Sequence, residues 1–449
     1  MAKELHQLQR GTNLRCSAGN VRVIEFIGEG GQGEVYRVEL NGRQYALKYY
    51  FNDHRICNQK FKNNLMEIIN DPVESDAFAW PLYLVENGNQ FGYIMELLPS
   101  GYHDIAEWIG GKVEKCEYNM LVKACITLCD AFRDLHAKGY SYKDISDSNV
   151  LFNPNNGKVV IVDNDNVTKN GERSCVNGTQ GFMAPELISY PTDAQPSRLT
   201  DLHSLAVLLF EILFSEHPLH GKKEYNMPVG LMDPIEVDKE LYGISTACFV
   251  FADEHNLNRF IELSVPAHVR MREDWKKYPE CLREMFVRAF VRGIKNPEDR
   301  PQAYQWTNVF IEFLGLLYRC PHCGHTHIYN QELFKRYKGV PPCDECGRAI
   351  RVPRMKIKTN LVLMTDNTVV YKGSFDNNAQ DKLAPMLEVE LHGDRMRLKN
   401  LSNYVVVCHN KEVRRGEYSD YLNPARYINS SQFLLDSIIV DGCKYDVEL

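Results

Sequence analysis

The sequence has no long run of apolar residues. Its first residues, MAKELHQLQRG, contain no apolar stretch, so we expect no secretory signal. The longest apolar run, Leu205–Phe214, is only ten residues long and contains Glu211. Such a run is too short and too charged to cross a bilayer. These absences argue against a membrane-spanning chain and predict a cytoplasmic protein.

An excess of positive charge is missing too, because the formal net charge is −7. This balance argues against nonspecific nucleic-acid binding by the whole chain. A disulfide-like pattern is also absent: ten of the 14 cysteines are scattered. The other four form two C-x-x-C pairs, which in a cytosolic protein indicate a metal site. With 449 residues, 44% of them hydrophobic, the chain is expected to form two or three globular domains.

A glycine-rich stretch, GEGGQGEV at residues 28–35, follows a strand-like run. Glycines let backbone amides approach phosphates closely. The same spacing occurs in dinucleotide-binding folds, where the loop leads from a strand into a helix. Here a second strand-like run follows, and Asn41-Gly42 then predicts a hairpin turn. The order favours a hairpin that covers a nucleotide.

Three oxygen-bearing side chains stand around a strand-like run further on. Asp144 and Asn149 lie five residues apart, and Asp163 follows Val159–Val162. A carboxylate can orient a hydroxyl, while an amide oxygen and a second carboxylate can hold a divalent cation. For each residue alone, a turn rich in Asp and Asn is the alternative. Together they predict a phosphoryl-transfer site.

These motifs resemble the protein kinase family, in particular bacterial eukaryotic-like serine/threonine kinases. The resemblance implies ATP as substrate nucleotide, Mg²⁺ or Mn²⁺ held by Asn149 and Asp163, and Asp144 as catalytic base beside Lys48. It also implies an α+β, two-lobed kinase fold. The expected boundaries are an extension at 1–19, an N-lobe at about 20–98 and a C-lobe at about 99–317.

The resemblance further implies a nucleotide pocket. Lys48 would bind phosphates and pair with Glu67 on the next predicted helix, with Glu74 as the alternative partner. Met95 would be the gatekeeper before a hinge that binds adenine through its backbone. The residues expected around the nucleotide are Gly28, Glu29, Gly30, Gly31, Gly33, Val35, Ala46, Lys48, Glu67, Met95, Glu96, Leu98 and Leu151.

The stretch Gly178–Glu186 resembles the end of a kinase activation segment. By that resemblance Thr179 hydrogen-bonds Asp144, which implies serine or threonine substrates. Structural roles fall to Asp201, at the start of a buried helix, and to an ion pair between Glu186 and Arg300. The candidate phosphorylation sites are Thr168, Ser174 and Thr179.

Three departures from the family pattern bear on activity. Ser146 stands where a lysine is usual, Lys143 replaces an arginine, and Asp163-Asn164-Asp165 replaces Asp-Phe-Gly. Asp165 could be an extra metal ligand. These changes keep a second hypothesis open, that of a pseudokinase scaffold that binds nucleotide, or nothing, and signals through its tail.

Two C-x-x-C pairs, Cys320/Cys323 and Cys343/Cys346, follow the kinase-like region. Four thiolates on two turns suit tetrahedral Zn²⁺, so residues 318–353 resemble a zinc ribbon. A redox dithiol pair is the alternative. The nearby His322, His325 and His327 are not needed to complete such a site. We expect the zinc to support folding, without an open position for catalysis.

Strand-like runs separated by turns fill residues 356–449 and predict a small all-β sandwich for interactions. Its likeness to a forkhead-associated domain is thin. Residues 331–358 hold eight Lys or Arg against three Asp or Glu, so nucleic-acid binding through the ribbon is a third hypothesis. Docking of an acidic partner, or docking on the kinase lobe itself, is favoured over it. The whole arrangement looks like bacterial kinases associated with a metal-dependent protein phosphatase and a von Willebrand A protein.

Overall fold

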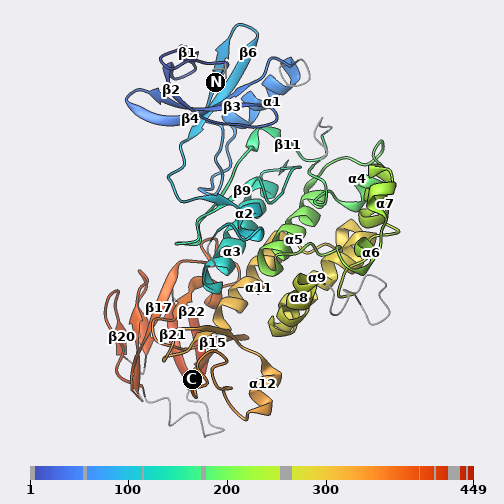
Figure 1. The fold of residues 1–449 in the computed structure, drawn as a ribbon. Helices are drawn as coiled ribbons and strands as arrows, with labels where there is room; N and C mark the ends of the chain where they lie inside the picture. Colours follow the sequence, from blue (N-terminus) through green and yellow to red (C-terminus); the bar gives the residue numbers. More distant parts are fainter. Residues whose placement is uncertain are drawn as a thin grey trace.

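The computed structural model describes residues 6–53, 58–113, 116–172, 178–252, 265–350, 352–393, 395–408, 411–422, 435–440 and 443–448. The chain forms an amino-terminal lobe, a larger helical lobe and a strand-rich tail (Figure 1). The tail lies at the end of the helical lobe that is remote from the first lobe. In the described part of the chain, every helix is too short or too polar to cross a membrane.

The amino-terminal lobe is an antiparallel barrel with the strand order β1-β2-β3-β4-β6-β5. Alternation places Val21, Val23, Tyr36 and Val38 in its interior. Helix α1, Gln59–Asn70, packs beside it, capped by the Asn58 side chain. The strands are β1 Asn13–Cys16, β2 Gly19–Glu29, β3 Gly33–Leu40, β4 Arg43–Tyr50, β5 Tyr83–Asn87 and β6 Gln90–Glu96.

The expected extension at residues 1–19 is wrong for its described part. Strand β1 pairs with β2 and also with β5, and so closes the barrel. Leu14 is buried inside it. The segment before β1 is held as well, since the amide of Gln7 donates to Glu34 and the amide of Leu8 donates to Tyr36. The short β1 lacks the length that would mark it as a strand in the sequence.

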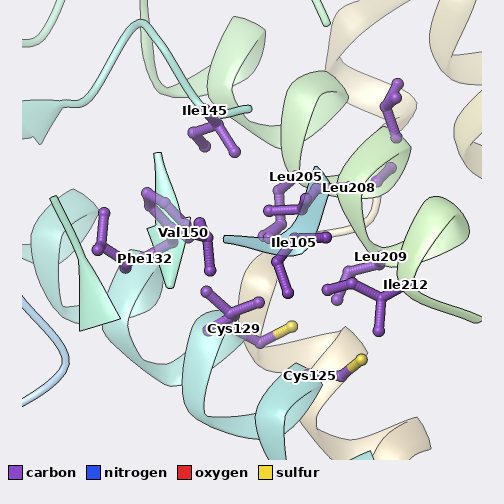
Figure 2. Close-up of a cluster of buried hydrophobic side chains, with 14 of the residues drawn as sticks. Ile105, Cys125, Cys129, Phe132, Ile145, Val150, Leu205, Leu208, Leu209 and Ile212 are labelled. Atoms are coloured by element: carbon purple, nitrogen blue, oxygen red, sulfur yellow. The ribbon is translucent and has the colours of Figure 1, made fainter. Parts of the chain in front are cut away.

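The helical lobe is built around α5, Arg198–Phe214, whose residues from Thr200 to Phe214 are all buried. Ser197 caps this helix in a capping box with Thr200. Figure 2 shows Leu205, Leu208, Leu209 and Ile212 of α5 facing Cys125 and Cys129 of α3, Tyr118–Ala137. Burial raises the pKa of both thiols, so these two cysteines serve as core side chains.

The remaining elements of this lobe carry the loops of the site or pack behind them. The short strands are β7 His103–Asp104, β8 Tyr140–Ser141, β9 Val150–Phe152, β10 Val159–Ile161 and β11 Thr168–Lys169. The helices are α2 Ile105–Ile109, η1 Asn164–Asn166, α4 Pro185–Ser189, α6 Lys222–Tyr225, η2 Val229–Leu231, α7 Pro234–Tyr242, α8 Pro266–Lys277, α9 Glu280–Val287, η3 Arg288–Arg292, α10 Gly293–Lys295, η4 Pro297–Asp299 and α11 Ala303–Gly315.

The tail starts with a hairpin and a short helix and continues as two sheets over one core. One sheet has the order β15-β14-β22-β21 and the other β16-β17-β18; Met355, Val362, Val389 and Leu398 are among the buried residues between them. The elements are β12 Leu317–Arg319, β13 Thr326–Ile328, α12 Gln331–Arg336, β14 Arg354–Ile357, β15 Asn360–Leu363, β16 Val369–Tyr371, α13 Lys372–Phe375, β17 Pro385–His392, β18 Arg395–Asn400, β19 Val406–Cys408, β20 Lys411–Val413, β21 Leu435–Val440 and β22 Cys443–Glu448.

The tail is packed against the helical lobe through α11. A Cβ atom on Gly315 would come within 2.5 Å of the Leu361 carbonyl oxygen, so β15 lies directly on the end of this helix. The buried Lys382 donates to Asn308 of α11 at 2.5 Å. Thr326 of β13 donates to Glu117 at 2.6 Å. The tail is therefore a fixed part of the molecule on the side away from the amino-terminal lobe (Figure 1).

Candidate active site

The loop between β8 and β9 brings Asp144, Asn149 and Thr179 together. Thr179 donates its hydroxyl proton to one carboxylate oxygen of Asp144 at 2.7 Å. The Asn149 amide donates to the Asp144 backbone oxygen at 2.9 Å and to its other carboxylate oxygen at 3.2 Å. Asp144 is half-buried. Its carboxylate is thus oriented on both sides and can accept a proton from a hydroxyl group.

A buried aspartate fixes the backbone of this loop from below. Asp201, near the start of α5, accepts the amides of Tyr142 and Lys143 at 2.7 and 2.8 Å. Its Oδ2 also lies 3.0 Å from His136 Nε2. Lys143 has φ of 77°, a left-handed conformation that a non-glycine residue adopts only when its surroundings enforce it. The expected structural position of Asp201 agrees with these contacts.

Asp163 follows β10 in a left-handed turn with φ of 55°. The Val162 amide donates to the Asn149 backbone oxygen at 3.0 Å, and Tyr142 donates its hydroxyl to the Val162 oxygen. The loops that carry Asp144 and Asp163 are therefore bonded to each other. Burial and the neighbouring Asp165 raise the pKa of Asp163, although Lys48 opposes this shift.

Asn164 occupies the position where the resemblance implies a phenylalanine, and it is fully buried. Its amide donates to the backbone oxygens of Ala79 and Ile161 at 2.9 and 3.0 Å. A polar side chain thus replaces an apolar one by bonding to the backbone on both sides. These bonds tie the turn after β10 to the segment before β5.

Lys48 of β4 is buried and lies between two carboxylates. Its Nζ is 3.1 Å from Asp163 Oδ1 and 3.0 Å from Asp165 Oδ2. Burial by itself lowers the pKa of the ammonium, but Asp165 and Asp163 raise it above its ordinary value. Lys48 is therefore charged beside the predicted cation ligands, where it can bind phosphate oxygens.

The expected pair between Lys48 and Glu67 is wrong in this structure. Glu67 lies on α1, as predicted, but its carboxylate contacts Lys169 of β11 and is 45% exposed. The reason is the carboxylate of Asp165, which lies nearer to Lys48 and is itself completely buried. The alternative partner, Glu74, is exposed in the segment after α1.

The glycine loop joins β2 to β3 as a hairpin above this cluster. A Cβ atom on Gly28, Gly30 or Gly31 would meet nothing within 4 Å. A Cβ atom on Gly33 would lie 2.3 Å from the Tyr49 backbone oxygen. Among these four glycines, only Gly33 is required by the packing of the strands. The open space at the other three suits a ligand that approaches the backbone.

Most of the residues expected around adenine lie on strands of the two lobes. Ala46 of β4 pairs with Met95 of β6, and both are buried. Glu96 ends β6 and turns its side chain to Arg43 at 2.6 Å. Val35 and Leu98 are half-buried and packed against the main core. Leu151 lies half-buried on β9, and Glu29 ends β2.

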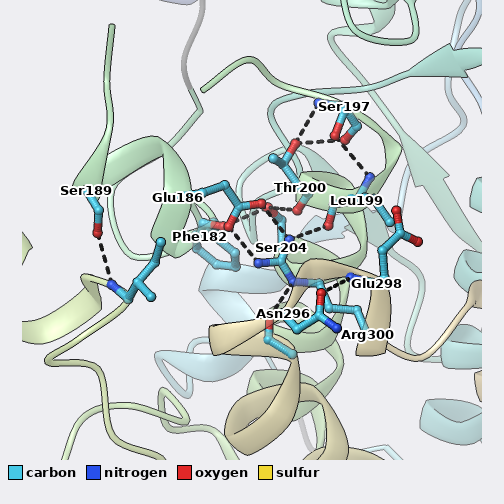
Figure 3. Close-up of polar contacts among 12 residues, drawn as sticks. Phe182, Glu186, Ser189, Ser197, Leu199, Thr200, Ser204, Asn296, Glu298 and Arg300 are labelled. Carbon is cyan, nitrogen blue, oxygen red and sulfur yellow. Dashed lines mark hydrogen bonds and ion pairs between the residues drawn. The ribbon is translucent and has the colours of Figure 1, made fainter. Parts of the chain in front are cut away.

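The segment after Asp163 ends in a buried ion pair. The two terminal guanidinium nitrogens of Arg300 donate to Glu186, at 2.8 and 2.6 Å. Arg300 also donates to the backbone oxygens of Leu199 and Gly293. Figure 3 shows this pair linking α4 to the residue after η4, beside Ser204 of α5. The pair expected between Glu186 and Arg300 is present.

The candidate phosphorylation sites differ in their settings. Thr168 is half-buried on β11, with its hydroxyl on the Lys169 oxygen. The Thr179 hydroxyl is already bonded to Asp144. Ser174 lies outside the described residues. Ser146, where a lysine is usual, is buried and its hydroxyl is 3.1 Å from that of Ser148.

The four tail cysteines come together between two turns. Cys320 Sγ lies 3.7 Å from Cys346 Sγ, and Cys323 Sγ lies 3.6 Å from Cys343 Sγ. Four sulfurs at about 2.3 Å from a tetrahedral Zn²⁺ would be about 3.8 Å apart, so the set fits that ion. Beside it, His325, His327 and Asp344 form a second, more exposed group of possible ligand atoms.

Sequence reasoning missed the partner of Lys48 and the strand that closes the barrel. It gave Asp165 only the role of a metal ligand and did not consider Tyr50, whose hydroxyl bonds Asp165. The signal in the sequence that could have indicated a partner for Lys48 is the acidic residue two positions after Asp163. Lys48 and Asp165 are 117 residues apart in the chain, so motif spacing alone does not reveal that they form a pair.

Comparisons with known proteins indicate a family for this chain. A family model described as protein kinase domain matches residues 21–255, just over half of the chain. Protein kinase C delta type from Rattus norvegicus is 26% identical over 244 residues, 53% of this chain and 34% of that protein. Serine/threonine-protein kinase PknD from Protochlamydia amoebophila is 23% identical over 322 residues, 60% of this chain and 32% of that protein.

One solved structure is the Mycobacterium tuberculosis PknI kinase domain, which aligns at 15% identity with a TM-score of 0.44. The alignment covers 68% of this chain and 98% of that chain. The chain spans about a third of the length of the curated relatives named above.

Proposed function

Since this chain belongs to the protein kinase family, we propose that it transfers the γ-phosphate of ATP to serine or threonine hydroxyls of proteins. The observation that carries the proposal is the Asp144 carboxylate, held by Thr179 and Asn149 and bonded through its loop to the turn of Asp163. The relatives named as serine/threonine kinases support the same substrate class.

In this proposal Asp144 orients the substrate hydroxyl and accepts its proton as the oxygen attacks the γ-phosphorus. Lys48 binds phosphate oxygens, and the glycine loop offers backbone amides to them. Asn149 and Asp163 would hold Mg²⁺ or Mn²⁺, which supplies charge neutralisation on the phosphates. Their amide and carboxylate oxygens are the donors that such an ion prefers.

The tail is proposed to bind zinc and a protein partner. The sulfur spacing supports a four-thiolate Zn²⁺ site, and the two sheets over one core support a β-sandwich interaction domain. A metal-dependent protein phosphatase and a von Willebrand A protein are the proposed partners, with the cytoplasm as the compartment. Nucleic-acid binding through the basic ribbon is the less favoured proposal.

The test is phosphate transfer from ATP with Mg²⁺ or Mn²⁺, with Asp144→Ala beside the wild type. Loss of a catalytic base lowers the rate by about 10²–10⁴-fold. The affinity for ATP should stay unchanged, because Asp144 does not touch the nucleotide in the proposed mechanism. Mass spectrometry would read phosphorylated serine and threonine. Asp147→Asn, three residues away in the same loop, is the matched control and should keep activity.

Equal incorporation by wild type and Asp144→Ala would contradict the proposal. No incorporation by either, with ATP still bound, would favour the pseudokinase scaffold. That second function has one specific observation behind it: Ser146 is buried and uncharged where a lysine would face the transferred phosphate.

A further inference from the structure

The carboxylate nearest to Lys48 on the buried side belongs to Asp165. Lys48 Nζ lies 3.0 Å from Asp165 Oδ2, and both side chains are almost fully buried. Tyr50, two residues after Lys48 on β4, donates its hydroxyl to the same oxygen. Tyr50 is itself buried between Phe61 of α1 and Phe91 of β6. One carboxylate oxygen therefore receives both an ammonium and a phenol from one strand.

The side chains of Lys48, Tyr50 and Asp165 are buried from water, so their polar groups depend on contacts within the protein. Buried charges are costly unless they are paired and hydrogen-bonded. Asp165 lies in η1. Its neighbour in this turn, Asn164, is bonded to Ala79 and Ile161. The position of Asp165 is thus set by the turn after β10 and does not depend on α1.

Helix α1 makes different contacts. Glu67 pairs with Lys169 of β11, and Asn64 donates to the Val167 backbone oxygen at 2.9 Å. Both contacts hold residues 167–169, which follow η1 at the start of the segment that ends at Glu186. The carboxylate of Glu67 on α1 is therefore paired with Lys169 and not with Lys48.

We propose that Asp165 is the positioning residue of Lys48 and takes the place of a glutamate from helix α1. This inference rests on the proposed function and deepens it. An ammonium has three donors. Asp165 fixes one of them from the buried side, and the other two point toward Asp163 and Gln32, where phosphate oxygens would bind. Lys48 is then set for ATP whatever the position of α1, and α1 serves the activation segment instead.

A metal-ligand role for Asp165 fits the contacts less well. Oδ2 already accepts Tyr50 and pairs with Lys48. The other oxygen, Oδ1, has no partner among the described residues but is fully buried beneath the same cluster. The two roles differ in how they respond to added metal, which gives the test its second arm.

The experiment compares full-length wild type, Asp165→Asn and Glu67→Gln. Asp165→Asn keeps the shape and an acceptor for Tyr50 but removes the charge. We expect it to lower kcat/KM for ATP about tenfold or more, with the KM for the protein substrate unchanged. Glu67→Gln should stay within about twofold. Glu86→Gln, an exposed pair of Lys62, is the neutral control, and thermal midpoints verify folding.

Glu67→Gln as damaging as Asp165→Asn, or a neutral Asp165→Asn, would overturn the proposal. So would an Asp165→Asn defect that is relieved by raising Mg²⁺ or by Mn²⁺, since that result assigns Asp165 to the metal. If the wild type transfers no phosphate, the proposed function fails, and ATP affinity by calorimetry decides: about tenfold weaker binding by Asp165→Asn supports the pairing, and equal binding refutes it.

Discussion

Glu211 carries an ionisable group into the middle of α5, and its carboxyl is buried. One of its oxygens, Oε2, has no hydrogen-bond partner among the described residues. Burial, with smaller contributions from Asp147 and Glu216, raises its pKa to about 8. At neutral pH the folded protein therefore keeps this group protonated, whereas the unfolded chain ionises it near its ordinary value.

The sign of the pH dependence follows from this raised pKa. Glu211 contributes full stability below about pH 4.5, and this contribution is lost as the pH rises toward 8. The loss is on the order of 3–5 kcal/mol. Glu211→Gln should gain thermal stability relative to wild type at pH 8 but not at pH 5. Thermal midpoints at both pH values measure this difference, with the exposed Glu39→Gln as control. A difference that does not change with pH would refute the assignment.

At the scale of one element, different glycines of the β2–β3 hairpin serve folding and ligand binding. Gly30→Ala should leave the thermal midpoint unchanged, because its Cβ has open space. It should raise the KM for ATP about tenfold, if one backbone hydrogen bond to a charged phosphate, about 1.5–3 kcal/mol, is lost. Nucleotide titrations measure the affinity.

The matched variant in the same hairpin is Gly33→Ala. Its Cβ would overlap the Tyr49 backbone, so the strands must shift at a cost of about 1–3 kcal/mol or more. We expect a lower thermal midpoint for Gly33→Ala. If Gly30→Ala lost stability and Gly33→Ala did not, the assignment of these two glycines would be reversed.

The sequence predicted elements well where local chemistry determines them. The hairpin at Asn41-Gly42, the buried α5 and most tail strands appear near the expected residues, because turn residues and apolar periodicity are local signals. Strand β1 escaped prediction because four residues carry little pattern. The partner of Lys48 escaped because a contact between β4 and η1 depends on how the lobes close, which no spacing encodes.

At the scale of the whole molecule, the tail is built on the helical lobe and kept apart from the proposed active site (Figure 1). Cys320 and Cys343 belong to a small core with Tyr318, Phe334 and Leu363. That core connects the cysteine turns to β15, which packs on the end of α11. Metal at the cysteines should therefore hold the tail in place without touching the residues around Asp144.

Removal of that metal should loosen the tail and leave the active site in place. Cys343→Ser should lose one Zn²⁺ per chain by metal analysis, since a structural site needs all four thiolates. Hydrogen exchange should then rise over residues 317–363, because the binding energy of structural zinc is folding energy. Phosphate transfer should stay within about threefold, as the cysteines lie in the tail, at the end of the helical lobe remote from the amino-terminal lobe (Figure 1). Cys16→Ser, a cysteine of β1 outside the cluster, should keep its zinc. Loss of phosphate transfer together with the metal would instead show that the tail supports the active site through α11.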